Sequence, residues 1–162
     1  MRARPGRVTA STRELRRGAC DLVLALALLA SGGCADFSTP EDPTGGLPDL
    51  LIDNPTFDAH VAPILEARCA TGGCHSPAGQ QAGLVLAPAV AYDNIVGVTS
   101  TLGEGMLHVA PGDAEDSWLL RMIGDDPAAR GGLSRMPLAS VPLTANQIEN
   151  IRRWIDQGAP RN

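Results

Sequence analysis

The sequence predicts an all-α domain with long loops rich in glycine and proline. Four segments carry apolar residues at helical spacing between recognisable start and stop residues. No segment alternates polar and apolar residues over the length of a useful strand. The chain has 162 residues, of which 18 are glycine and 13 are proline. This length accommodates one ordinary domain with short appendages.

The first predicted helix begins after Thr56, whose hydroxyl can cap it, and runs into a cysteine pair. Pro63 should kink this helix or start its second half, because proline lacks the backbone N–H that a helix interior uses. A short helix within residues 89–97 follows and ends at Gly97. The apolar face of the first helix consists of Phe57, Val61, Ile64 and Leu65.

Two more helices complete the domain. Asp113 is expected to cap the third, which ends at Gly124. Thr144 and Gln147 have the spacing of a capping box at the start of the last helix, and Gly158 follows its end. The apolar positions of the two helices are Trp118, Leu119, Met122 and Ile123 in the third, and Ile148, Ile151, Trp154 and Ile155 in the last.

The first 33 residues have the pattern of an export signal. Six arginines lie in residues 1–17, and an apolar run over 22–30 is shorter than the roughly 20 residues that span a bilayer. Cys34 follows small residues, where a lipoprotein signal places its lipid-modified cysteine, although Ser31 stands where that pattern has leucine. We therefore expect lipidation of Cys34, with simple cleavage near residues 32–35 as the alternative.

A flexible tether is expected over residues 34–55, which are rich in proline, glycine and aspartate and show no helical period. The domain should then occupy residues 56–162. Beyond residue 33 the chain has seven arginines, no lysine and sixteen acidic residues, which give a net charge of −9. Such a surface repels phosphate backbones, so we expect no nucleic-acid partner and favour a protein partner with a basic face.

The stretch "CATGGCH" places Cys69, Cys74 and His75 within seven residues. One interpretation is covalent haem, in which both thiols form thioethers and the adjacent histidine binds the iron. The cysteines are separated by four residues instead of the usual two, so two residues must bulge outward. Gly72 and Gly73 suit such a bulge because glycine tolerates unusual backbone angles.

Two other interpretations of the motif remain open. A disulfide between Cys69 and Cys74 is compatible with export, but it would close a small ring that constrains little chain entropy and leaves His75 unexplained. A zinc site needs a further strong ligand, and only His60 and His108 are left as histidine candidates.

A resemblance extends over residues 56–160 and depends on the order of several segments. The chain resembles planctomycete-type cytochrome c domains, which occur in secreted bacterial proteins that include myxobacterial lipoproteins. The long CxxxxCH spacing departs from the common motif. The segments that carry the resemblance are "FDAHVAPILEARCATGGCH", "AGLVL", "VAPGDAEDSWLLRMI", "RMPL" and "LTANQIENIRRWIDQGAP".

The resemblance implies a class I cytochrome c-like fold around one covalent haem c. It assigns the thioethers to Cys69 and Cys74, the proximal axial position to His75 and the distal axial position to Met136. Pro137 supports this assignment because proline disfavours a helical backbone at the preceding residue. A thioether opposite an imidazole raises the reduction potential of haem iron.

Other side chains are weaker candidates for contact with the haem. Met106 and His108 are the reserve axial ligands, and Met122 is expected in the core. The resemblance also implies that the first and last helices cross, so we expect Phe57 to pack against Trp154. Arg135 precedes Met136 and is a candidate partner for a haem propionate, with a solvated side chain as the alternative.

These observations predict an exported monohaem c-type cytochrome that carries single electrons in the periplasm or at the cell envelope, anchored by lipid at Cys34. We expect no substrate chemistry, because His75 and Met136 would fill both axial positions. Two alternatives remain: a peroxidase-like or ligand-sensing haem protein with Met136 off the iron, or a haem-free surface lipoprotein module with a Cys69–Cys74 disulfide.

Overall fold

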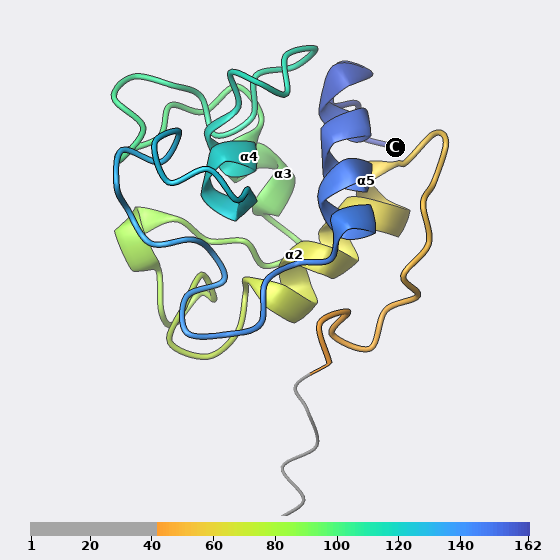
Figure 1. Cartoon of the computed structure of the whole chain (residues 1–162), viewed down its shortest axis with the longest axis horizontal. Helices are drawn as coiled ribbons and strands as arrows, with labels where there is room; N and C mark the ends of the chain where they lie inside the picture. The colour runs from red at the N-terminus through yellow and green to blue at the C-terminus, as the bar shows by residue number, and fades with distance from the viewer. Residues whose placement is uncertain (1–41) are drawn as a thin grey trace, which may run out of the picture. The chain divides into compact units, whose positions relative to one another are not determined.

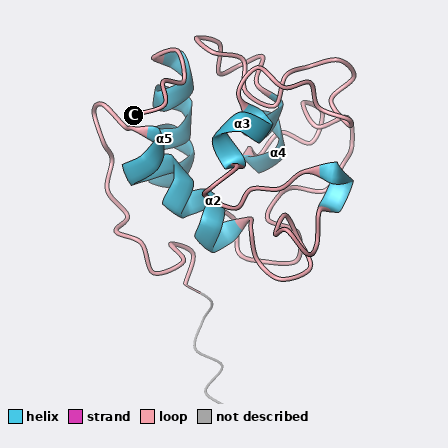
Figure 2. Ribbon diagram, turned by 180° about the vertical axis from the view of Figure 1, so that it is seen from behind, coloured by secondary structure: helices cyan, strands magenta, loops and turns pink. Residues whose placement is uncertain are grey.

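The computed structural model describes residues 42–162, where the regular elements are helices and the strand pairing is limited to isolated bridges (Figures 1 and 2). The predicted export signal and Cys34 lie outside these residues. No helix in the described part is long and apolar enough to cross a membrane. The helical elements are η1 (Phe57–Val61, a π-helix), α2 (Ala62–Arg68), η2 (Gln81–Gly83, a 3₁₀ turn), α3 (Ala91–Ile95), α4 (Trp118–Ile123) and α5 (Ala145–Asp156).

The first predicted helix consists of η1 followed directly by α2. Pro63 lies in the first turn of α2, which confirms that it starts the second half. The predicted cap at Thr56 is wrong, because the Thr56 hydroxyl lies 3.0 Å from Nδ1 of His60 and bonds no N–H of the helix. The side chain of Asn162 takes this role, since its Oδ1 accepts the N–H of Phe57 at 3.2 Å.

Helix α4 is shorter than the sequence predicts and begins only at Trp118. Asp113 does not cap it; its carboxylate accepts the N–H of Asp116 at 3.0 Å, in a turn that precedes the helix. The N–H of Trp118 donates to the carbonyl of Leu107 at 2.9 Å, so the chain before α4 is paired with a loop instead of being helical. The predicted end at Gly124 is confirmed.

Helix α5 agrees closely with its sequence pattern. The hydroxyl of Thr144 accepts the N–H of Gln147 at 3.1 Å, and the Gln147 amide oxygen accepts the N–H of Thr144 at 3.1 Å. This reciprocal pair confirms the predicted capping box. Gly158, just past the helix end, has a φ of +94°, which favours glycine.

An aromatic cluster joins the first and last helices, which meet at η1 and α5 (Figure 1). The ring centroids of Phe57 and Trp154 are 5.3 Å apart, and Tyr92 of α3 lies 5.1 Å from Phe57. The indole N–H of Trp154 donates to the carbonyl of Pro160 at 2.9 Å. The predicted packing of Phe57 on Trp154 is therefore confirmed.

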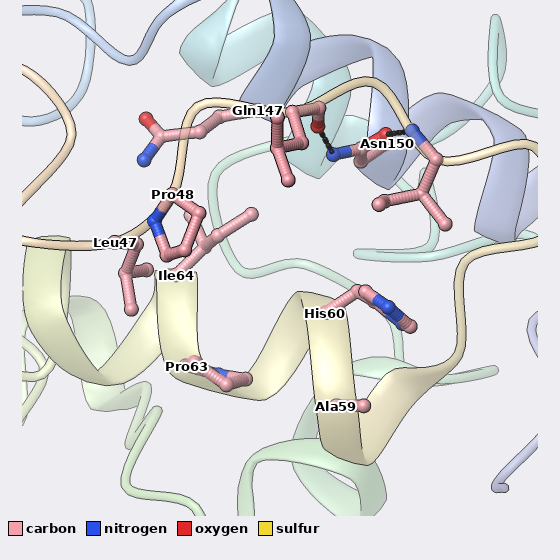
Figure 3. Close-up of a pocket in the computed structure, with 10 residues that line it drawn as sticks. Leu47, Pro48, Ala59, His60, Pro63, Ile64, Gln147 and Asn150 are labelled. Atoms are coloured by element: carbon pink, nitrogen blue, oxygen red, sulfur yellow. Dashed lines mark hydrogen bonds between the residues drawn. The ribbon is translucent and has the colours of Figure 1, made fainter.

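The predicted tether is corrected for residues 42–55, which we call the strap, because these residues pack on α5 (Figure 3). The amide of Asn150 accepts the N–H of Ile52 and donates to the carbonyl of Leu50, both at 2.8 Å. Gln147 donates to the carbonyl of Thr44 at 2.9 Å. Both amide side chains are buried, so the strap backbone satisfies polar groups that would otherwise lack partners.

Replacing Asn150 tests whether the strap belongs to the folded domain. Asn150→Ala should lower the free energy of unfolding by about 1–3 kcal/mol, because it leaves two strap backbone groups unsatisfied. Urea denaturation measures this change. Asn146→Ala is the matched control, because the Asn146 amide makes one exposed hydrogen bond of 3.3 Å, to the carbonyl of Asp49. This substitution should change the free energy of unfolding little. If both variants were as stable as the unmutated chain, the interpretation of residues 42–55 as a free tether would be restored.

Candidate functional site

The cysteine–histidine motif forms a compact turn at the end of α2. Cys69 is the C-cap of this helix, and its carbonyl accepts the N–H of His75 at 3.1 Å. The N–H of Cys74 donates to the carbonyl of Thr71 at 2.9 Å. A Cβ at Gly79 would lie 2.3 Å from the carbonyl oxygen of Cys74, so the returning chain needs glycine at this position. The turn thus brings both cysteines and the histidine to one place.

The two glycines inside the motif face solvent, in agreement with an outward bulge. Gly72 and Gly73 are exposed, and a Cβ at either would meet no atom within 4 Å. Neither has a positive φ. The bulge therefore does not require glycine at these two positions, and the glycine that packing requires is Gly79.

Two adjoining cavities lie beside the motif, an inner one of about 220 Å³ and an outer one of about 330 Å³. Both are lined by Cys69, His75, Gln81 and Met136. Cys74 lines the outer cavity as well, so the four residues predicted to hold haem surround one space. The apolar wall of the inner cavity includes Leu84, Leu86, Trp118, Leu119, Met122 and Ile123.

The ring of His75 is oriented by the backbone. Its Nδ1 lies 3.3 Å from the carbonyl oxygen of Leu84. A carbonyl only accepts, so the proton resides on Nδ1 and leaves the Nε2 lone pair for a metal. The carbonyl of His75 accepts the N–H of Leu86 at 2.8 Å, which ties the same loop to the motif. Nε2 of His75 is thus left free to bind a metal.

Met136 is held in the cavity wall by its backbone. Its N–H donates to the carbonyl of Met122 at 2.9 Å, which fixes the loop against α4. The side chain is half-buried and lines both cavities, and the peptide bond to Pro137 is cis. Met122 is buried, as predicted for the core, and it also lines the inner cavity.

His108 is the reserve ligand that shares a cavity with His75. Its backbone is fixed on both sides, because its N–H donates to Val98 at 2.7 Å and its carbonyl accepts from Leu119 at 2.9 Å. Burial, and then the nearby His75, lower the pKa of His108 below its ordinary value, so the ring is neutral at neutral pH. Met106, the other reserve, lines neither of the two cavities.

The two cysteines have different environments, although both are free thiols. Burial raises the pKa of the Cys69 thiol to about 12, and the Arg68 guanidinium offsets part of that effect. Cys74 is exposed.

Within residues 42–162, no three side chains of histidine, cysteine, aspartate or glutamate converge as a zinc site would require.

Alkylation should distinguish the two thiols in protein made without haem attachment. Iodoacetamide should modify Cys74 readily and Cys69 far more slowly, because a pKa of about 12 leaves about a thousandfold less thiolate than the ordinary 9.0. Peptide mass spectrometry over time measures both rates. In protein with thioether-bound haem, neither cysteine should react. Equal rates in the haem-free protein would contradict the burial of Cys69.

Comparisons with known proteins do not identify the chain. No protein-family model, no curated protein and no solved structure matches it. The assignment of a function therefore depends on the residues around the two cavities.

Some residues that shape the site carried no signal in the sequence. The carbonyl of Leu84 orients His75, but a backbone acceptor has no residue signature. Trp118 was predicted only as part of a helix stripe and proves to line the inner cavity.

Arg135 lines neither cavity; it donates to the carbonyl of Ile123 at 2.9 Å and pairs with Asp125.

Proposed function

We propose that this chain is a monohaem c-type cytochrome of the planctomycete-type cytochrome c family that carries single electrons outside the cytoplasm. The observation that carries the proposal is the shared space of the inner and outer cavities. Two cysteines, one histidine with a free Nε2 and one methionine surround it, and its inner wall is mainly apolar. This set of side chains suits covalent haem with two axial ligands.

Each of the four residues has a distinct role in this proposal. Cys69 and Cys74 would hold haem c through thioethers, and His75 and Met136 would supply the ligands of its iron. When bound, haem supplies the one-electron chemistry. The apolar wall contributed by α4 excludes water, and the Leu84 carbonyl keeps the Nδ1 proton of His75 in place. Because His75 and Met136 would both serve as ligands, we expect the site to carry electrons and not to bind peroxide or oxygen.

Export and the type of partner belong to the same proposal. An export signal over residues 1–33 would deliver the chain across the inner membrane, where c-type haem is attached, and lipid at Cys34 would anchor it in the periplasm or at the envelope. The net charge of −9 beyond residue 33 favours a redox partner with a basic face.

Intact mass and the visible spectrum of the full chain, made in a host with haem-attachment machinery, test the proposal. The mass should exceed that of the processed polypeptide by one haem, the haem should survive a denaturing gel, and the reduced protein should show the bands of a c-type cytochrome. A double Cys69→Ser, Cys74→Ser variant is the control and should lose the haem on denaturation. A polypeptide two hydrogens lighter, with no Soret band, would instead support the disulfide module.

A further inference from the structure

Arg68 lies between the cysteine–histidine motif, the strap and the loop that carries Met136. It is the last residue of α2 and directly precedes Cys69. The residue is 8% exposed and lines the outer cavity. Residues 136–139 line the same cavity, and we call residues 136–141 the methionine loop. Arg68 is therefore placed to act on the loop that carries the proposed distal ligand.

The guanidinium of Arg68 bonds both the methionine loop and the strap. Nη2 donates to the carbonyl of Val141 at 2.6 Å and to the hydroxyl of Ser140 at 3.4 Å. Nη1 donates to the carbonyl of Asp42 at 3.2 Å. Hydrogen bonds from a charged group are stronger than those between neutral groups, and the planar fork of arginine can serve two segments at once. These bonds connect the end of α2 to the start of the strap and to the end of the methionine loop.

The strap also packs on the aliphatic part of Arg68. Gly45 has a φ of +66°, which favours glycine, and a Cβ at this position would lie 2.7 Å from Cδ of Arg68. The strap backbone thus restricts the conformations open to the arginine side chain. A side chain that is already restricted loses less entropy when it bonds the methionine loop.

The methionine loop needs support from outside, because its tip buries little surface. Leu138 is 58% exposed, and Ala139 is exposed with a φ of +54°. A residue other than glycine keeps such a φ only where the surrounding structure holds it. The two residues that follow Ala139 are those that bond Arg68. Arg68 therefore acts where the loop backbone is strained.

We propose that Arg68 is a positioning residue that holds the methionine loop beside the outer cavity and so keeps the sulfur of Met136 available as a ligand. The role of Met136 in this inference rests on the proposed function, whereas the bonds from Arg68 to the loop do not involve haem. Without the guanidinium, the loop should open more often while the motif stays in place.

Amide hydrogen exchange of the full chain as purified, followed by mass spectrometry, tests whether Arg68 holds the loop. Arg68→Gln should raise the exchange rate over residues 136–143 about tenfold or more, since hydrogen bonds from a charged donor contribute stability of this size. Arg68→Lys keeps the charge but lacks the fork, and it should give a smaller rise. If Arg68→Gln does not fold, Arg68→Lys decides.

Arg153→Gln is the matched control. Arg153 also bonds the strap, through the carbonyl of Ile52 at 3.1 Å, and it pairs with Glu149 at 2.9 Å. In the described part of the chain it bonds no residue of the methionine loop, and it lines neither the inner nor the outer cavity. This variant therefore weakens the strap alone and should leave exchange over residues 136–143 unchanged.

The haem-loaded full chain tests whether the held loop positions Met136. Arg68→Gln should weaken the near-infrared absorption of a sulfur–iron bond and speed cyanide binding about tenfold, because cyanide enters when the loop is open. Arg68→Lys should do the same to a smaller extent, so that loss of charge does not explain the change.

Unaltered exchange in Arg68→Gln and Arg68→Lys would overturn the proposal. Faster exchange with an unaltered near-infrared band and cyanide rate would overturn the positioning of Met136. A protein without a Soret band overturns the proposed function instead, and exchange alone then decides whether Arg68 holds the methionine loop.

Discussion

Trp154→Ala is expected to lower the free energy of unfolding by about 3–5 kcal/mol, the typical loss for a large aromatic side chain removed from a core. Trp154 has no exposed surface. It contacts the ring of Phe57 from the other end of the domain, and Tyr92 lies 6.4 Å away. Its N–H bond to Pro160 also ties down the C-terminal residues. One substitution therefore removes packing contacts that connect η1, α3 and α5.

Urea denaturation, followed by far-ultraviolet circular dichroism, measures this loss. Leu51→Ala is the control, because this leucine is 49% exposed and its removal should change stability by about 0.5 kcal/mol or less. Trp154→Phe keeps an aromatic ring, so its loss of unfolding free energy should lie between those of Trp154→Ala and Leu51→Ala. A Trp154→Ala protein as stable as the unmutated chain would show that the aromatic cluster does not stabilise the domain.

The sequence predicts helices best where their caps are local. The capping box of α5 involves residues three positions apart, and it was found correctly. Helix α4 was predicted too long, since nothing near Asp113 indicates that Trp118 pairs with Leu107 across a loop. The cap of η1 was missed for the same reason, because Asn162 lies more than one hundred residues away.

The strap was misread because composition does not reveal long-range hydrogen bonds. Its proline and glycine content is typical of a linker. Its partners are Gln147 and Asn150, polar residues buried on α5. A search for apolar periodicity passes over such residues, so the packed face of α5 was predicted too narrow.

The candidate site was predicted in its side chains but not in its surroundings. The adjacency of Cys74 and His75 pointed to the motif, and Met136 was selected through Pro137 and a resemblance. The structure places these side chains around one cavity. The hydrogen bonds of Arg130 could not be predicted, because they depend on how the loop over residues 124–133 folds back on the guanidinium.

Met136→Ala is expected to change the haem-loaded protein more than any other single substitution in the loop. It should abolish the weak sulfur-to-iron absorption in the near infrared and lower the reduction potential, because a thioether ligand favours reduced iron. Cyanide should then bind faster, since no strong ligand has to leave first. The backbone bond from Met136 to the Met122 carbonyl does not involve the side chain, so the loop should keep its path.

Three matched measurements make this prediction specific to Met136. Met106→Ala removes a methionine that lines a separate cavity of about 480 Å³ and neither the inner nor the outer cavity, so it should leave the near-infrared band and the potential unchanged. His108 shares the inner cavity with His75, so His108→Ala tests the other possible ligand. If Met136→Ala leaves the band and the potential unaltered while His108→Ala changes them, the distal ligand is His108 and the cytochrome proposal survives. If the unmutated ferric protein is already high-spin and binds peroxide readily, an axial position is open at rest, and the electron-carrier proposal gives way to the peroxidase-like alternative.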